Sequence, residues 1–255
     1  MLNFDAVIFD MDGIITRTAA LHSLAWKGMF DDYLHYREIK YNEPFLEFSH
    51  TDDYLCFVDG RPRYDGVHAF LKSRGIKIPF GKLGDDPGDE TVCGLGNRKN
   101  HFFKKVLEQE GATVYHSTLK LIKTLLKRGI KVGVATSSKN CELILKKAGI
   151  AELFQTRVDG VVSAERRLKG KPEPDIFTAA SDNLGVNYNR TVVVEDAVSG
   201  VQAGCKGHFG LVIGVARENN AHELKSNGAD IVVADLSELS ADEIDRLIGS
   251  KQRGR

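Results

Sequence analysis

The feature that most constrains the fold is a short apolar run near the start of the chain that ends in two carboxylates. Ala6–Phe9 is apolar throughout, and Asp10, Asp12 and Gly13 follow it. Such a run between acidic residues predicts a strand buried on both faces of a parallel sheet. Ionised side chains avoid the interior unless they are paired or bind a cation, and ligands bind at the carboxyl ends of strands in open α/β sheets. The pattern predicts a Mg²⁺ site with one carboxylate able to attack a substrate, with an ordinary Asp-Gly turn as the alternative.

Beyond Val114 the chain alternates between extended and helical patterns. Glycines such as Gly129 and Gly185 end several of the helical stretches. Strands that alternate with helices indicate βαβ units, so we expect an α/β fold with a doubly wound parallel sheet. The further strands are expected at residues 130–135, 158–162, 191–194, 211–215 and 231–233, and the helices between them include residues 142–148 and 175–184.

Between residues 17 and 113 the sheet pattern disappears. Residues 18–38 and 97–109 have the apolar spacing of helices. Residues 81–96 contain five glycines and four acids, which predicts a mobile loop. The whole block therefore predicts a mostly helical second domain that is inserted into the α/β core. The expected boundaries are residues 17–113 for the inserted domain and residues 1–16 with 114–255 for the core.

The composition argues against several classes of protein. The chain is 42% hydrophobic and 27% charged, as globular domains are, and Lys+Arg and Asp+Glu are both 35. A formal net charge of zero argues against a nucleic-acid partner, because such binders are normally basic. No apolar run reaches the ~18 residues of a membrane span, and the start of the chain lacks the features of a secretion signal. The four cysteines form neither a metal-type pair nor a disulfide framework, so we expect a cytoplasmic protein. We also expect a monomer.

Polar clusters follow three of the predicted strands. Asp10 and Asp12 follow the first, Thr136-Ser137-Ser138 follows the second, and Glu195-Asp196 ends a later one. The carboxyl ends of parallel strands lie on one edge of a sheet, so these segments are expected to meet. Several carboxylates this close could not all ionise without a cation, and Mg²⁺ suits a few carboxylates plus a substrate phosphate. Lys171, with Lys169 as the fallback, supplies a point charge for phosphate.

These motifs resemble the signature of the haloacid dehalogenase-like phosphotransferases. The matching segments are Asp10-Met-Asp12-Gly13, Thr136, Lys171 and Glu195-Asp196. The resemblance implies a Rossmann-like core with an inserted cap domain. It also implies that Asp10 is a nucleophile that forms an aspartyl-phosphate, and that Asp12 is the general acid and base. In the same way it implies that Thr136 and Lys171 hold the transferring phosphate. Mg²⁺ would be held by Asp10, the backbone carbonyl of Asp12, and Asp196, with Glu195 beside them.

Within that family the cap resembles the β-phosphoglucomutase branch. Residues 14–27 match the start of its cap, with His22 and Trp26 in corresponding places, and Arg63 and Lys99 match cap residues that bind a second phosphate and the sugar. Ser138-Lys139-Asn140, next to Ser137, matches the core loop that holds the phosphate that is not transferred. One departure is Arg17, where this branch usually has an Asp. Considered singly, a histidine at the position of His22 is more often a partner of a backbone group than a catalyst, and an isolated Arg63 or Lys139 is more often a solvated surface base.

Three functions are consistent with these motifs. The first is a Mg²⁺-dependent mutase that moves phosphate between the 1- and 6-positions of β-glucose. The second is a phosphatase of a small sugar phosphate, which needs no second anionic site. The third is a receiver module that is phosphorylated on an Asp and binds a partner. The second carboxylate at Asp12 and the helical insertion argue against a receiver, so we expect an enzyme whose partner is a small phosphorylated sugar.

Overall fold

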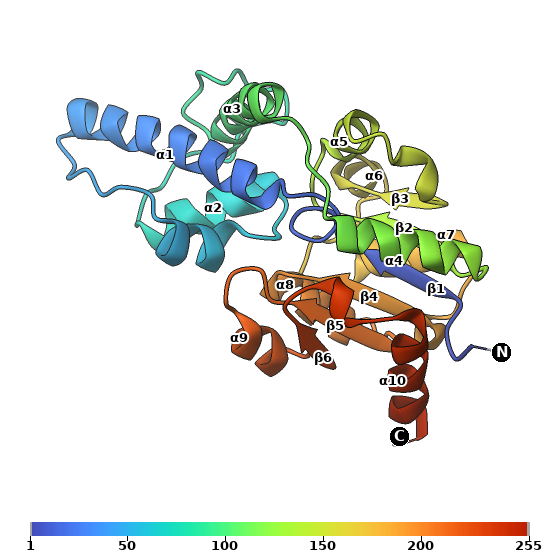
Figure 1. The fold of residues 1–255 in the computed structure, drawn as a ribbon. Coiled ribbons are helices and arrows are strands. Elements are labelled where there is room, and N and C mark those ends of the chain that lie inside the picture. Colours follow the sequence, from blue (N-terminus) through green and yellow to red (C-terminus); the bar gives the residue numbers. More distant parts are fainter. Residues whose placement is uncertain (1, 254–255) are drawn as a thin grey trace. The chain divides into compact units, whose positions relative to one another are not determined.

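A computed structural model describes residues 2–253 of the chain (Figure 1). The chain divides into two compact units: the residues up to Arg17 together with those from Ala112 onward form one, and Thr18–Gly111 form the other. The segments that leave and re-enter the first unit are paired with each other. Thr16 forms an antiparallel bridge with Val114, and the Arg17 amide donates to the Thr113 carbonyl at 2.8 Å. The insertion therefore begins and ends at one point of the core.

The first unit is built on a six-stranded sheet in the order β3-β2-β1-β4-β5-β6. Neighbouring strands are all parallel, and Phe9 of β1 is paired with both Val134 and Val194. This confirms the predicted doubly wound parallel sheet. The strands are β1 (Ala6–Phe9), β2 (Lys131–Ala135), β3 (Thr156–Val158), β4 (Thr191–Glu195), β5 (Leu211–Val215) and β6 (Ile231–Val233).

Helices cover both faces of this sheet (Figure 1). One face packs against α7 and α8 through an apolar cluster that includes Ile8, Phe177 and Val201. The opposite face is covered by α4 and α10, which also contact each other. Because β1 is covered on both sides, all four of its residues are buried, which is why its sequence is a continuous apolar run. The helices are α4 (His116–Lys127), α5 (Cys141–Lys147), α6 (Gly160–Glu165), α7 (Asp175–Leu184), α8 (Val198–Lys206), α9 (Ala221–Ser226) and α10 (Ala241–Arg253), with short 3₁₀ turns η2 (Ala151–Leu153), η3 (Tyr188–Arg190) and η4 (Leu236–Glu238).

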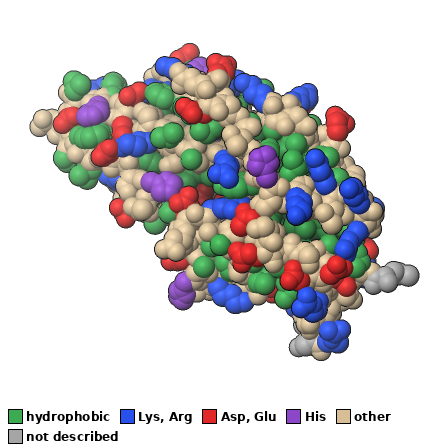
Figure 2. Space-filling model, viewed as in Figure 1, with side chains coloured by type: hydrophobic (Ala, Val, Ile, Leu, Met, Phe, Trp, Pro, Cys, Tyr) green, Lys and Arg blue, Asp and Glu red, His purple; other side chains and the backbone are tan. Residues whose placement is uncertain are grey.

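Helix α4 shows how the mixed surface charge is arranged. Leu121, Ile122 and Leu125 are buried against the sheet, whereas the lysines on the other side of the helix are exposed. Figure 2 shows basic side chains gathered over this helix. The spacing is that of an amphipathic helix whose lysines form the solvated face. Among residues 2–253, no helix is both long and apolar enough to cross a membrane.

The second unit is helical and has its own core. Its elements are α1 (Ala19–Tyr41), the π-helical segment η1 (His50–Val58), α2 (Arg63–Ser73) and α3 (Val92–Glu110). Aromatic rings dominate the interior: the Phe30 ring centroid lies 4.0 Å from that of Phe70 and 5.0 Å from that of Phe48. Aromatic pairs at these distances contribute packing energy beyond their area. The predicted helical character of this segment is confirmed.

Residues 158–162 differ from the prediction of a short strand. The strand β3 ends at Val158, and Val161 and Val162 belong to α6. Asp159 causes the change, because its Oδ1 accepts hydrogen bonds from the amides of Val161 (2.9 Å) and Val162 (3.0 Å). A carboxylate that satisfies the first amides of a helix favours helix formation over the β-propensity of valine.

The predicted mobile loop at residues 81–96 is also wrong in part. Helix α3 begins at Val92, so Gly94 lies inside it, and a Cβ on Gly94 would come within 2.4 Å of the Asp89 carbonyl oxygen. The glycine there permits close packing. The preceding residues are tied to α3 as well, since Asn97 Nδ2 donates to the Leu83 and Asp85 carbonyls at 3.1 and 2.9 Å.

We expect Phe30→Ala to lower the free energy of unfolding of the second unit by about 3–5 kcal/mol, because a fully buried ring would leave a cavity among other rings. Trp26 is the single tryptophan of the chain, and its ring lies 5.4 Å from Phe30, so its fluorescence in a urea titration reports on this unit. Phe80→Ala is the control, since Phe80 is 51% exposed and its loss should change stability by at most ~0.5 kcal/mol. Equal losses in both variants would contradict the assigned core.

Candidate active site

The site lies where the strand order of the sheet reverses. From β1 the chain builds outward through β2 and β3, and then returns to the other side of β1 to form β4. The crevice at the carboxyl ends of the strands at such a reversal is the usual ligand position in open α/β sheets. Asp10 directly follows β1 and Glu195 ends β4, so both acids stand at this crevice. The order of the strands thus brings together residues that are far apart in the sequence.

A buried lysine links these two acids. Lys171 Nζ lies 2.5 Å from Asp10 Oδ1 and also donates to Glu195 Oε1. Lys171, Asp10 and Glu195 are 4%, 6% and 0% exposed, respectively. The ammonium also lies 5.1 Å from the centroid of the Phe177 ring. Lys169, in contrast, is exposed, so Lys171 is the residue that enters the site.

The charges in this cluster are unbalanced. Burial raises the pKa of Asp10 well above its ordinary value, and the nearby charges of Glu195 and Asp12 raise it further, whereas Lys171 opposes the shift. Burial alone would lower the pKa of Lys171, but the carboxylates of Asp10 and Glu195 outweigh it and raise that pKa. One ammonium therefore serves several carboxylates. A further cation beside these carboxylates would lower the pKa of Asp10.

Two glycines let acidic side chains at this edge pack closely against the backbone. A Cβ on Gly13, whose φ is +81°, would lie 1.7 Å from Asp196 Oδ2, so the Asp196 carboxylate packs directly against this residue. A Cβ on Gly200 would lie 1.8 Å from Glu195 Oε1. The Asp10–Gly13 loop is itself closed tightly, because the Gly13 amide donates to the Thr16 carbonyl at 2.8 Å. Close approach of backbone to a side chain is the property that glycine uniquely supplies.

The loop after β2 lies at the same edge. Thr136 is buried, and its Oγ1 accepts a hydrogen bond from the Ser138 amide at 3.1 Å. This leaves the Thr136 hydroxyl proton to donate to a ligand. Ser138 Oγ accepts a hydrogen bond from the Asn140 amide at 3.2 Å. The loop also packs closely on the start of α6, since a Cβ on Gly160 would lie 2.5 Å from the Ser137 carbonyl oxygen. Lys139 contacts the same glycine.

The oxygens at this edge fit Mg²⁺ in kind. The Asp10 and Asp196 carboxylates and the Asp12 carbonyl are hard ligands, and Mg²⁺ commonly completes its shell with water and substrate phosphate. Over residues 2–253 no three His, Cys, Asp or Glu side chains are grouped closely enough to hold a metal by themselves. Glu195 is engaged elsewhere: its Oε1 binds Lys171 and its Oε2 accepts from the Ala197 amide at 2.7 Å. The structure thus places Glu195 beside the donor set.

In the second unit, three of the predicted substrate-binding residues form one cluster. Lys99 Nζ lies 2.6 Å from His22 Nδ1 and 4.8 Å from the Trp26 ring, and the His22 ring stacks on Phe103 at 4.0 Å. Burial lowers the pKa of His22 well below its ordinary value, and the positive charges of Lys99 and Arg63 lower it further. The imidazole is therefore neutral, with Nδ1 accepting from the ammonium. Lys99 is buried, which a solvated surface base would not be.

Arg63, the fourth predicted residue of this unit, belongs to the same neighbourhood. Its Nη2 donates to Asn100 Oδ1 at 2.9 Å, and burial lowers the pKa of its guanidinium. A Cβ on Gly96 would lie 3.3 Å from Arg63 Cδ, so the arginine packs against α3. The structure therefore collects the predicted residues into two groups, one in each unit.

Two residues that sequence reasoning did not single out contact the acidic loops. Arg217 Nε donates to the Gly13 carbonyl at 2.9 Å, and Asn220 Nδ2 donates to the Asp196 carbonyl at 3.0 Å. Both lie in the segment that follows β5, which is the neighbour of β4. Their position directly after a predicted strand was the available signal.

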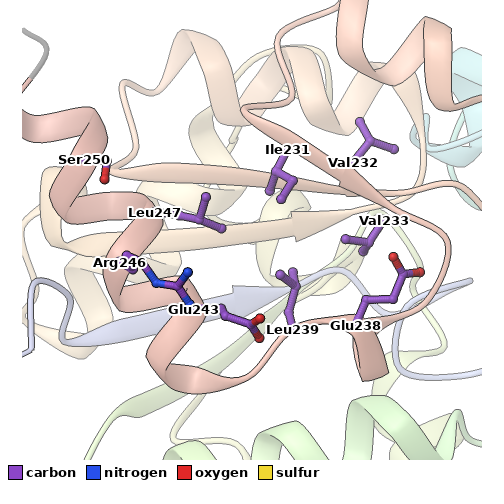
Figure 3. A pocket seen from close by; sticks show the side chains of 9 residues that line it. All are labelled: Ile231, Val232, Val233, Glu238, Leu239, Glu243, Arg246, Leu247 and Ser250. Atoms are coloured by element: carbon purple, nitrogen blue, oxygen red, sulfur yellow. The ribbon is translucent and has the colours of Figure 1, made fainter.

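A separate pocket lies between β6 and α10 (Figure 3). It has a volume of about 390 Å³, and Ile231, Val233 and Leu247 contribute apolar lining, with Glu243 and Arg246 beside them. None of the predicted site residues lines it. Two strands, β4 and β5, separate β6 from β1, so this hollow belongs to the edge of the sheet.

Comparison with known proteins agrees with this architecture. Residues 4–206 match the model of a family described as haloacid dehalogenase-like hydrolase. The chain is 45% identical over 238 residues to a β-phosphoglucomutase of Mycobacterium bovis, covering 92% of this chain and 90% of that protein. It is 26% identical to a phosphorylated carbohydrates phosphatase of Thermotoga maritima, covering 90% and 94% of the two chains.

Among solved structures, a β-phosphoglucomutase from Clostridium difficile has a TM-score of 0.77 at 23% identity, covering 99% of this chain and 100% of that one. This likeness shows that the two chains share a fold. The family match and the close sequence relatives together show an enzyme. The chain belongs to the haloacid dehalogenase-like hydrolase family, in its β-phosphoglucomutase-like branch.

Proposed function

We propose that this enzyme is a Mg²⁺-dependent phosphotransferase with an aspartyl-phosphate intermediate, and that it converts β-glucose 1-phosphate to glucose 6-phosphate. The observation that carries the proposal is the buried contact between Lys171 and Asp10 at the strand-order reversal. It holds one oxygen of the Asp10 carboxylate, Oδ1, and leaves the other, Oδ2, as the attacking atom. A carboxylate nucleophile divides one difficult transfer into two easier ones.

In the first step Asp10 Oδ2 forms a bond to phosphorus, and the bond from phosphorus to the sugar oxygen breaks. Asp12 donates a proton to that leaving oxygen. In the second step the oxygen of an incoming hydroxyl bonds to phosphorus, the bond from phosphorus to Asp10 Oδ2 breaks, and the hydroxyl proton goes to Asp12. Asp10 is then a carboxylate again, and Asp12 is again a carboxylic acid. One residue can serve as acid and then as base because the two steps are the reverse of each other in proton demand.

The remaining groups supply charge and orientation. Thr136 donates its hydroxyl proton to an equatorial phosphoryl oxygen, and Lys171 neutralises part of the negative charge there. Phosphoryl transfer depends chiefly on such positioning and charge neutralisation. Asp10, the Asp12 carbonyl and Asp196 would hold Mg²⁺, which when bound draws negative charge from the phosphoryl oxygens. Glu195 keeps Lys171 in place through its Oε1.

The buried cations of the second unit favour a mutase over a phosphatase. A mutase must bind a bisphosphate in two orientations, so it needs a second anionic site. Lys99 is buried and Arg63 is half-buried in the same neighbourhood, and burial of a charge is costly unless a ligand or partner offsets it. The alternative is a phosphatase of a small sugar phosphate, in which water reaches the phosphorylated Asp10.

We expect Asp10→Asn to reduce turnover of β-glucose 1-phosphate by ~10⁴-fold or more, because an amide of the same shape cannot attack phosphorus. A coupled assay of glucose 6-phosphate measures this. Asp182→Asn removes a carboxylate of α7 that accepts from Tyr188, away from the predicted site residues, and should retain wild-type turnover. Unchanged turnover in folded Asp10→Asn protein would rule out the covalent mechanism.

The two candidate reactions differ in their phosphate balance. With β-glucose 1-phosphate, Mg²⁺ and a trace of the 1,6-bisphosphate, we expect glucose 6-phosphate to appear without free phosphate, because a sugar hydroxyl is the acceptor. Chelation with EDTA should abolish turnover, and added Mg²⁺ should restore it. Release of one phosphate per sugar consumed would instead assign the phosphatase reaction.

A further inference from the structure

We propose that Arg217 and Asn220 are positioning residues that hold the Asp10–Gly13 loop and the Asp196 loop together for Mg²⁺ binding. This inference rests on the proposed function and deepens it. Both side chains come from one short segment between β5 and α9, and each donates to the backbone of a different acidic loop. The two loops meet at Gly13, against which the Asp196 carboxylate packs.

Arg217 is the more heavily anchored of the two residues. Besides the 2.9 Å bond from Nε to the Gly13 carbonyl, its Nη1 donates to Asp235 Oδ2 at 2.9 Å and to the Ala234 carbonyl at 3.2 Å. Its guanidinium carbon lies 3.8 Å from the centroid of the Tyr115 ring. The side chain is only 14% exposed. A planar guanidinium with several fixed donors can tie the segments after β1, β5 and β6 together, which a lysine cannot do.

Asp235 keeps the guanidinium in this orientation. Its Oδ2 also accepts from Ser117 Oγ at 2.9 Å, and its Oδ1 accepts from the Ser237 amide at 2.9 Å. Burial would raise the pKa of Asp235, but the hydrogen bonds from Ser237, Arg217 and Ser117 together lower it, so this carboxylate stays ionised opposite Arg217. Asp235, which is itself bound by Ser117 of α4, thus holds the guanidinium beside the Gly13 carbonyl.

Asn220 completes the contact on the other loop. Its Nδ2 donates to the Asp196 carbonyl at 3.0 Å from the residue that precedes α9. The register of the sheet brings these segments together, because Glu195 of β4 is paired with Gly214 of β5. One segment therefore holds both loops.

The arrangement has a clear physical use. Asp10, Asp12 and Asp196 carry like charges and tend to move apart when no cation is bound. The Asp12 carbonyl can serve as a ligand only if the peptide units around it keep their orientation, and Arg217 holds the next carbonyl along the chain. Residues that orient metal ligands typically change metal affinity 10- to 100-fold when they are replaced.

Mg²⁺ affinity measured by calorimetry on the metal-free, folded protein tests the proposal. We expect Arg217→Met to raise the dissociation constant of Mg²⁺ by ~10-fold or more. At saturating Mg²⁺, KM for β-glucose 1-phosphate should change by less than about twofold, and kcat should recover in part. Arg217→Lys keeps the charge and one donor and should show a smaller loss than Arg217→Met. Arg190→Met is the matched control, because Arg190 also donates to a carbonyl (Leu2) and to a carboxylate (Asp5). Arg190 lies next to the amino end of β4, so its replacement should leave the Mg²⁺ affinity unchanged.

Asn220→Ala tests the contact to the Asp196 loop without a change of charge, and covers the case in which Arg217→Met does not fold. We expect a severalfold rise in the dissociation constant of Mg²⁺. If wild-type protein binds Mg²⁺ and turns over β-glucose 1-phosphate, while folded variants at Arg217 and Asn220 bind Mg²⁺ as tightly, the positioning role is overturned and the proposed function stands. An equal loss in Arg190→Met would also overturn it. Wild-type protein without Mg²⁺ binding or turnover would overturn both proposals.

Discussion

The ammonium of Lys171, held between the carboxylates of Asp10 and Glu195, is the interaction on which the site depends. All three groups are buried, and a buried charge is tolerated only when it is paired and hydrogen-bonded. Loss of one member of such a pair typically costs about 3–5 kcal/mol, because the other charge is left buried without compensation. The lysine therefore joins the first strand, the fourth strand and the loop before α7 at the place where the sheet reverses its order.

The same contact explains the sign of the ligand that the site favours. One ammonium lies among the acids Asp10, Asp12, Glu195 and Asp196, which favours a further cation at this site. Glu195 and Asp196 are adjacent in sequence yet differ in their contacts, since Glu195 holds Lys171 and Asp196 packs on Gly13.

Arg17, the residue at which the chain departs from the β-phosphoglucomutase branch, packs on an aromatic ring at the junction of the two units. Its guanidinium carbon lies 4.7 Å from the centroid of the Tyr115 ring, the same ring that Arg217 contacts at 3.8 Å. Arg17 and Tyr115 stand on the paired segments where the inserted unit begins and ends. A cation over an aromatic face stabilises such a pairing by about 0.5–1 kcal/mol at an exposed position, so the arginine strengthens the junction.

The sequence by itself determined the strands, the parallel sheet and the polar segments at the ends of the strands. Runs such as Ala6–Phe9 and Leu211–Val215 are buried on both faces, so their composition alone marks them. Periodicity did not predict two local features that depend on capping and packing. Asp159 caps α6, so Val161 and Val162 are helical. Gly94 permits close packing within α3, which begins earlier than its apolar spacing indicates. Only the tertiary structure decided that Glu195 binds Lys171 and that Arg217 and Asn220 reach the acidic loops. Those contacts join residues far apart in the chain, and their geometry depends on strand order and register, which no local pattern contains.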